Sequence, residues 1–254
     1  MDYISLDSLY SKRIDAELFS VSEYPSDGDA NERLECQTSE DTIFHSGFVS
    51  ISDVIPDAVL EVRYYSAYNF VGERIDSYEA PIAYLTREAA YALKNASDEL
   101  KKQGFLIKIY DAYRPQSAVD HFVRWANDPN ATEMKSAFYP NVDKSELFSN
   151  GYIAKKSSHS RGSAVDLTLV DASSGCDVDM GCGFDFFGDI AHAYRTDGLT
   201  KTQINNRSVL RKAMTESGFL PLAEEWWHFS LKDEPYPNTY FDFPIISRKR
   251  VSAK

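Results

Sequence analysis

SSHSRGSAVDLTLV, residues 157–170, contains an imidazole and a carboxylate on either side of the start of a predicted strand. From residue 164 to residue 170, apolar side chains at 165, 167 and 169 alternate with small or polar ones. This period of two is typical of a β-strand with one apolar face. We therefore expect Asp166 on the face of the strand that points away from the packed side. His159 is expected just ahead of the strand, in a turn loosened by Gly162.

A second stretch, EWWHFSL at residues 225–231, offers a carboxylate and an imidazole three positions apart. Its aromatic residues predict a strand over 226–231. Residues three apart in a regular strand face opposite sides. Glu225 and His228 can therefore share a site only if Glu225 lies at the start of the strand, where the chain bends.

The two stretches together carry the ligands of a catalytic metal. His159, Asp166 and His228 have the types and number of ligands that hold one catalytic zinc and leave a position open for water. Glu225 is then a spare carboxylate, suited to act as general base for such a water. We predict one zinc per chain. The other histidines lack a comparable partner pattern and are interpreted as surface or linker (His45), helical (His121) and structural (His192).

These motifs resemble those of the VanX-type D-alanyl-D-alanine dipeptidases, which are zinc metallopeptidases. SxHxxGxAxD at 157–166 and EWWH at 225–228 match the metal-binding motifs of that family. Further similar pieces are YDAYRPQ at 110–116, RY at 63–64 with NFVG at 69–72, and MGCGFDF at 180–186. The resemblance covers about residues 48–246, and it implies a fold of the hedgehog and D,D-peptidase type.

The resemblance also implies site residues. It gives His159, Asp166, His228 and Glu225 the roles described above. Arg114 would stabilise the oxyanion, Asp185 would pair with the free ammonium group of the substrate, and Ser157 would lie at its carboxylate end. A guanidinium is a permanently charged donor fork that suits a developing oxyanion. A carboxylate facing the free amino terminus would favour dipeptides over long chains.

The sequence around Arg114 and Asp185 leaves a structural alternative for each. The predicted strand at 105–110 and a helix that begins with Pro115 place Arg114 in a strand-to-helix connection, a usual place for site residues. The guanidinium could instead hold that loop through carbonyl groups. Asp185 lies in an acidic, glycine-rich stretch at 177–189 whose carboxylates could be solvated. The spacing there does not fit an EF-hand calcium loop.

The remaining pattern predicts one α+β domain, with a small, mainly antiparallel sheet flanked by helices. Thr86 is a plausible N-cap for a helix that ends before Gly104, and a second helix around 209–214 ends at Gly218. Residues 48–65 carry short extended pieces. We assign residues 1–46 to an acidic, serine-rich extension with a short helix around 4–18, and residues 47–254 to the zinc dipeptidase domain.

Composition limits the partners and the compartment. The net charge of −12 and the pI near 4.9 argue against a nucleic-acid partner. No apolar run approaches the ~18 residues that span a membrane. The start of the chain does not read as a signal peptide, which favours the cytoplasm, with the periplasm as the alternative if a leader has been removed. Cys176 and Cys182 could form a disulfide or remain free thiols, and Cys36 would stay unpaired.

The predicted activity is zinc-dependent hydrolysis of the small dipeptide D-Ala-D-Ala. The nearest alternatives are a cell-wall D,D-carboxypeptidase or an L-Ala-D-Glu endopeptidase with the same zinc site. A non-catalytic, zinc-stabilised binding module is the alternative of another class. Glu225 argues against the binding module, because a structural site needs no spare base. Asp185 argues against the carboxypeptidase, whose substrate has no free ammonium near the scissile bond.

Overall fold

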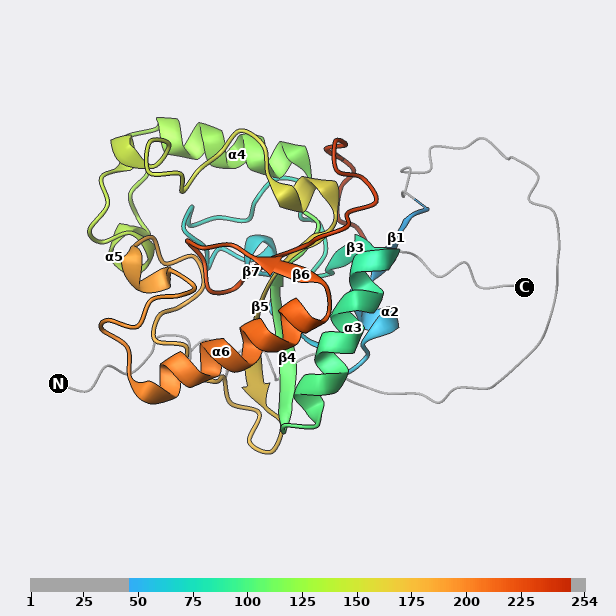
Figure 1. Cartoon of the computed structure of the whole chain (residues 1–254). Coiled ribbons are helices and arrows are strands. Elements are labelled where there is room, and N and C mark those ends of the chain that lie inside the picture. Colours follow the sequence, from blue (N-terminus) through green and yellow to red (C-terminus); the bar gives the residue numbers. More distant parts are fainter. Residues whose placement is uncertain (1–45, 248–254) are drawn as a thin grey trace, which may run out of the picture. The chain divides into compact units, whose positions relative to one another are not determined.

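The structure is a computed structural model that describes residues 46–247 (Figure 1). The predicted N-terminal extension, its short helix, Cys36 and His45 lie outside the described residues. The described strands are β1 (Phe48–Ser50), β2 (Val59–Leu60), β3 (Tyr84–Thr86), β4 (Phe105–Asp111), β5 (Ala164–Asp171), β6 (Phe219–Pro221) and β7 (His228–Leu231). The described α-helices are α2 (Ile51–Val54), α3 (Arg87–Lys101), α4 (Gln116–Asn127), α5 (Lys135–Phe138) and α6 (Lys201–Glu216). Short 3-10 helices lie at Arg63–Tyr65, Lys144–Glu146, Ser158–Arg161 and Asp189–Ala191.

The central sheet has five strands in the order β2-β4-β5-β7-β6. Only the β2–β4 pair is parallel, and the other three pairs are antiparallel. A separate antiparallel pair joins β1 to β3. The predicted α+β class and its small, mainly antiparallel sheet are therefore confirmed.

Strand β5 lies at the centre of this sheet and is buried on both faces. Val165, Leu167 and Leu169 are fully buried on one face, as the alternation predicts. Asp166 and Thr168 on the opposite face are 2% exposed. Asp166 thus lies opposite the apolar face, as expected, and this polar face is buried as well.

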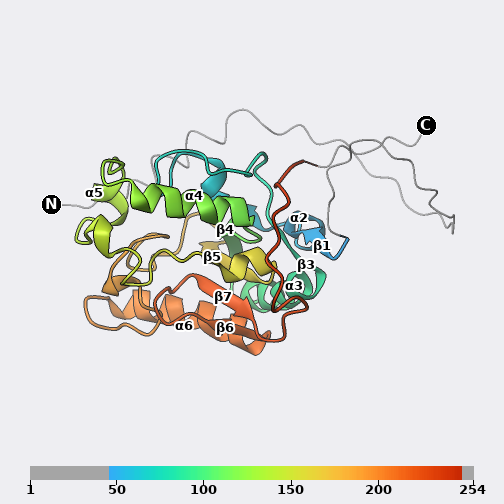
Figure 2. The ribbon, with the colours of Figure 1, turned by 90° about the horizontal axis from the view of Figure 1, so that it is seen from above.

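Helices α3 and α6 pack on one another and against the sheet, while α4 lies on the opposite side of the sheet from α6 (Figure 2). The Thr86 hydroxyl accepts the backbone N–H of Ala89, which confirms the predicted N-cap of α3. Helix α6 begins with a capping box in which Thr200 and Gln203 satisfy each other's backbone N–H groups. Both helices bury the face that the apolar spacing predicts.

Three boundaries differ from the sequence-based expectations. Pro115 is the N-cap residue of α4 rather than a residue of its first turn. Residues 48–65 contain the short helix α2 and a 3-10 turn between the extended pieces. Strand β7 begins at His228, two residues later than predicted, because residues 226–227 form a turn.

Two further expectations concern the membrane and the cysteines. No helix within residues 46–247 is both long and apolar enough to cross a membrane. Cys176 and Cys182 are free thiols in the structure, one exposed and the other half-buried. The disulfide alternative for this pair is therefore not realised.

Candidate metal centre and substrate cavity

Three predicted metal ligands converge in the structure. His159 Nε2 lies 3.1 Å from His228 Nδ1 and 3.2 Å from Asp166 Oδ2. His228 Nδ1 lies 3.0 Å from Asp166 Oδ1. All three side chains are buried, and they form the one His/Cys/Asp/Glu group within residues 46–247 whose atoms are close enough to share a metal ion.

The sheet register brings two of these ligands together. Asp166 on β5 pairs directly with His228 on β7, so the two side chains lie side by side on one face. His159 reaches the same point from the 3-10 helix at Ser158–Arg161, which ends at Gly162 with a φ of +78°. A Cβ at Gly162 would lie 2.2 Å from the Phe48 ring, so both the turn and the close packing require glycine.

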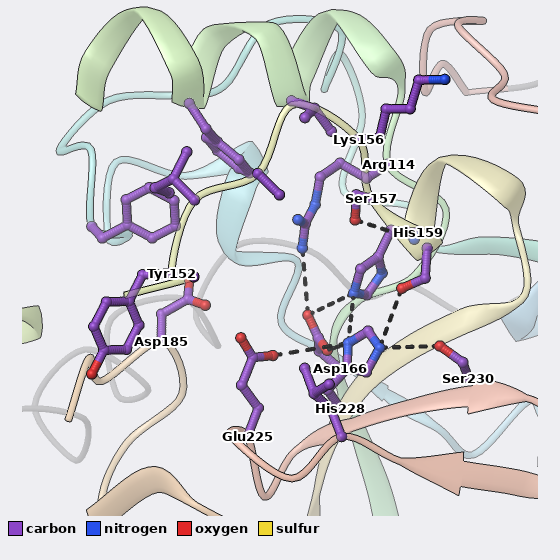
Figure 3. A pocket seen from close by; sticks show the side chains of 18 of the residues that line it. Arg114, Tyr152, Lys156, Ser157, His159, Asp166, Asp185, Glu225, His228 and Ser230 are labelled. Atoms are coloured by element: carbon purple, nitrogen blue, oxygen red, sulfur yellow. Dashed lines mark hydrogen bonds and ion pairs between the residues drawn. The ribbon is translucent and has the colours of Figure 1, made fainter. Parts of the chain in front are cut away.

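Hydrogen bonds on the outer nitrogens of the two histidines fix the rings. His159 Nδ1 lies 2.6 Å from the carbonyl oxygen of Ala112. A carbonyl only accepts, so Nδ1 carries the proton and Nε2 turns its lone pair inward. His228 Nε2 contacts the hydroxyls of Ser230 at 3.1 Å and Ser158 at 3.3 Å, which leaves Nδ1 on the inner side (Figure 3). Such outer partners orient metal-binding imidazoles.

The donor set fits a tetrahedral cation such as zinc. With metal–ligand bonds of about 2.0–2.1 Å, neighbouring ligand atoms of a tetrahedral site lie about 3.3 Å apart. Here His159 Nε2 and His228 Nδ1 are 3.1 Å apart, His228 Nδ1 lies 3.0 Å from Asp166 Oδ1, and His159 Nε2 lies 3.2 Å from the other carboxylate oxygen, Oδ2. Burial favours the protonated form of Asp166, but His159 and His228 outweigh it and hold the pKa of this carboxyl well below its usual range. An ionised carboxylate and two inward lone pairs are what a cation requires.

Glu225 lies beside the ligand group, in the turn before β7. Its Oε2 is 3.9 Å from His228 Nδ1, and about a third (33%) of the side chain is exposed to the cavity. Residues three apart in a regular strand would face opposite sides of the sheet. Glu225 and His228 can nevertheless face the same cavity, because the turn at residues 226–227 places Glu225 outside the strand. Burial raises the pKa of Glu225 to about 7, against the lowering effect of His228. A carboxyl group with that pKa can both take and return a proton near neutral pH.

Arg114 follows β4 and is held from three sides. Its Nε donates to Asp111 Oδ2 at 2.9 Å, and its Nη2 forms an ion pair with the same oxygen at 2.8 Å and donates to Asp166 Oδ2 at 3.5 Å. The guanidinium lies 4.9 Å from the centre of the Tyr64 ring and 5.2 Å from that of Phe122. The alternative in which the Arg114 guanidinium holds its loop through backbone carbonyl groups is not supported. The guanidinium instead contacts carboxylates and aromatic rings.

Asp185 faces the same cavity from the irregular segment between β5 and α6 (Figure 3). It is 6% exposed and has a left-handed backbone with a φ of +59°, a strained conformation for a residue other than glycine. The Tyr64 hydroxyl donates to its Oδ2 at 2.9 Å. Burial raises the pKa of Asp185 well above its usual range, and the nearby Asp166 raises it further. The alternative that the Asp185 carboxylate is exposed to solvent is therefore wrong.

A buried arginine of α6 fastens the segment that carries Asp185. Arg207 Nε donates to the carbonyl of Met180 at 2.6 Å, and its Nη2 donates to Cys182 Sγ at 3.5 Å. Its Nη1 donates to the carbonyl of His192 at 3.2 Å, and its guanidinium lies 5.7 Å from the ring of Trp226. The same residue thus connects the Asp185 segment to the turn that carries Glu225.

Ser157 lies at the edge of the cavity, where its hydroxyl also caps the 3-10 helix by accepting the N–H of His159 at 3.2 Å. The cavity has a volume of about 410 Å³, within the range of small-molecule sites. All seven predicted site residues line it, together with five aromatic residues: Tyr64, Phe70, Phe122, Tyr152 and Phe187.

Sequence reasoning missed several residues that support the site. Asp111 and Tyr64 lie in the stretches that carry the family resemblance, but no role was assigned to them. The interval from Asp111 to Arg114, an acid three residues before a base, was the available signal. Arg207 carries no such signal, because its partners are backbone carbonyls distant in sequence.

Comparison with known proteins agrees with these motifs. Residues 45–246 match the profile of the D-ala-D-ala dipeptidase family of peptidases. A D-alanyl-D-alanine dipeptidase of Enterococcus faecium is 41% identical over 199 residues, covering 78% of this chain and 98% of that protein. Its counterpart in Streptomyces coelicolor is 39% identical over 198 residues, with 78% and 98% covered. The counterpart in Escherichia coli K12 is 34% identical over 183 residues, with 72% and 83% covered.

Proposed function

The chain belongs to the D-ala-D-ala dipeptidase family of metallopeptidases, and on this basis we propose that it hydrolyses D-Ala-D-Ala to two molecules of D-alanine. The observation that carries the proposal is the convergence of three metal ligands, a carboxylate with a raised pKa and a guanidinium on one cavity. Membership of this peptidase family favours an enzyme over a zinc-stabilised binding module.

We assign the metal to zinc, one ion per chain, at His159, Asp166 and His228. Two imidazoles and one carboxylate are a common catalytic zinc set, and the hard, oxygen-rich coordination that calcium or magnesium prefers is absent from this group within residues 46–247. Zinc bound there would supply Lewis-acid polarisation of the scissile carbonyl and activation of a water molecule.

Glu225 acts as the general base. Its carboxylate lies on the cavity side of His228, where it accepts a proton from the attacking water and returns it to the nitrogen of the leaving D-alanine. Both transfers require a group whose pKa lies near the working pH, and the enclosure of Glu225 raises its pKa in that direction.

Arg114 stabilises the negative charge that develops on the carbonyl oxygen. Its Nε and Nη2 are engaged by Asp111 and Asp166, and no described residue accepts from Nη1. The guanidinium is therefore fixed in advance and still has a free donor, as electrostatic stabilisation of a transition state requires.

Asp185 binds the ammonium group of the substrate and Ser157 its carboxylate end. Burial and the nearby Asp166 raise the pKa of Asp185, and Arg114 offsets this only in part, so the ionised carboxylate needs a further cation as its partner. The ammonium of a dipeptide supplies that cation, with the Tyr64 hydroxyl as the second partner of Asp185. A longer peptide offers a neutral amide at this position, so the site selects dipeptides.

A substrate panel tests the proposal. We expect release of D-alanine from D-Ala-D-Ala, and a value of kcat/KM for N-acetyl-D-Ala-D-Ala that is lower by on the order of 10² or more, because the acetylated substrate leaves Asp185 unpaired. L-Ala-L-Ala and a muramyl pentapeptide complete the panel. Equal cleavage of the free and acetylated dipeptides would replace the dipeptidase by the carboxypeptidase alternative.

A further inference from the structure

Asp111 is a buried carboxylate to which the mechanism above gives no role. It is the last residue of β4, at a bulge where it pairs in register with Asp166 of β5. It is 1% exposed, and both of its oxygens are occupied. Oδ1 accepts a hydrogen bond from the Tyr78 hydroxyl at 2.6 Å. Oδ2 accepts a hydrogen bond from Arg114 Nε, forms an ion pair with Arg114 Nη2, and lies 3.6 Å from His159 Nδ1.

The Arg114 guanidinium lies between two carboxylates that have different tasks. Its Nη2 is 2.8 Å from Asp111 Oδ2 and 3.5 Å from Asp166 Oδ2. Asp166 is a ligand of the proposed metal, and a close guanidinium would compete with a cation for the same oxygen. Asp111 Oδ2 accepts a hydrogen bond from Nε and forms a close ion pair with Nη2, while the hydrogen bond from Nη2 to Asp166 is long, at 3.5 Å.

We propose that Asp111 is a positioning residue that directs Arg114 toward the scissile carbonyl and limits its pairing with the metal ligand Asp166 to one long contact. The oxyanion part of this inference rests on the proposed function. The part that concerns metal affinity does not, because it depends only on which carboxylate the guanidinium binds.

Removal of the Asp111 charge should therefore weaken zinc binding indirectly, because the released Arg114 guanidinium would compete with zinc for Asp166. In Asp111→Asn the amide no longer forms an ion pair with the guanidinium, which then moves onto Asp166. We expect a loss of zinc affinity and of kcat by about 10- to 100-fold each, the usual effect of losing a residue that orients a metal site. Zinc affinity is measured by titrating the metal-free protein against a competing chelator.

The double variant separates positioning from a general structural role. In Asp111→Asn combined with Arg114→Ala, the competing cation is gone. Zinc affinity should then return to within about threefold of the wild-type value, and kcat should equal that of Arg114→Ala alone. A merely structural role of Asp111 predicts instead that removing Arg114 restores nothing.

Asp177→Asn is the matched control. Asp177 also forms an ion pair with a residue of β4, Lys108, at 2.5 Å, but neither residue lines the cavity. Its zinc affinity and kcat should remain at the wild-type values. Tyr78→Phe is the second variant if Asp111→Asn does not fold. It frees Oδ1 without changing the charge, and should lower kcat only when Arg114 is present.

Two results would overturn the inference. One is wild-type zinc affinity in Asp111→Asn, and the other is a loss of affinity that persists in the double variant. If the wild-type protein failed to cleave D-Ala-D-Ala, the proposed function would fall, but the recovery of zinc affinity in the double variant would still support the positioning role.

Discussion

The two ends of the cavity are built in different ways. At the metal end, Asp166 and His228 are paired across two strands of the sheet, and their inner atoms already lie 3.0 Å apart. At the ammonium end, Asp185 lies on an irregular segment with a left-handed backbone, held in place by Tyr64 and, indirectly, by Arg207. The first end is fixed by the sheet register, and the second by side chains from distant parts of the chain.

We expect the two ends to have different functions, the metal end in the reaction itself and the ammonium end in the choice of substrate. The metal end must hold its ligands within tenths of an ångström, and a hydrogen-bonded sheet provides that rigidity. In the proposed mechanism, the ammonium end decides which substrate is accepted. Changes at the metal end should therefore abolish the reaction with every substrate, while changes at the ammonium end should alter the ratio between substrates.

The largest effect is expected from the loss of a metal ligand. His159→Ala and His228→Ala should lose their zinc and fall to background activity on free and acetylated dipeptides alike, because two ligands do not hold the metal. Metal analysis of the purified variants checks this. The matched control is His121→Ala, since His121 on α4 contacts Glu73 and Asp76 outside the cavity and should leave the zinc in place. Full zinc occupancy in both ligand variants would refute the assignment.

Glu225→Ala is expected to separate metal binding from catalysis. The variant should keep its zinc, because Glu225 is not a ligand, and lose about 10²–10⁴-fold in kcat, the usual contribution of a general base. Zinc content and turnover are measured on the same sample. Glu224→Ala, the exposed neighbour, is the control and should retain normal kcat. Normal turnover by Glu225→Ala would mean that another group takes the proton.

Asp185→Asn should give the smallest and most selective effect. A hydrogen bond to a charged group contributes about 1.5–3 kcal/mol, so kcat/KM for D-Ala-D-Ala should fall by roughly 10- to 100-fold. The acetylated dipeptide, which carries no ammonium, should be affected much less. Asp189→Asn is the control, because Asp189 is exposed and pairs with Arg195. Equal losses for the two substrates would show that the two ends of the cavity are not separate in function.

The metal end, which is built on the sheet, was easier to predict from the sequence than the ammonium end, which is built on an irregular segment. Alternation along residues 164–170 and the cap at Thr86 are local signals, and both correctly predicted their elements. The spacing of His159, Asp166 and His228 predicted a ligand group that the register then brings together. The start of β7 was placed two residues too early, because aromatic residues favour strands even where tertiary packing imposes a turn.

The ammonium end offered no such signals. The left-handed conformation of Asp185 is imposed by its surroundings, and nothing in its neighbourhood in the sequence requires it. Arg207 reaches the carbonyls of Met180 and His192 across 27 and 15 residues, contacts that no local pattern encodes. Asp111 could have been noticed beside Arg114, but its distance from Asp166 depends on the β4–β5 register.

The central claim is that the reaction depends on a metal held by His159, Asp166 and His228. Its most direct test is the rate of D-alanine release from D-Ala-D-Ala by the wild-type protein before and after removal of metal by a chelator. We predict that activity is lost on metal removal and returns in full with about one zinc per chain. Undiminished turnover by the metal-free protein would contradict the account.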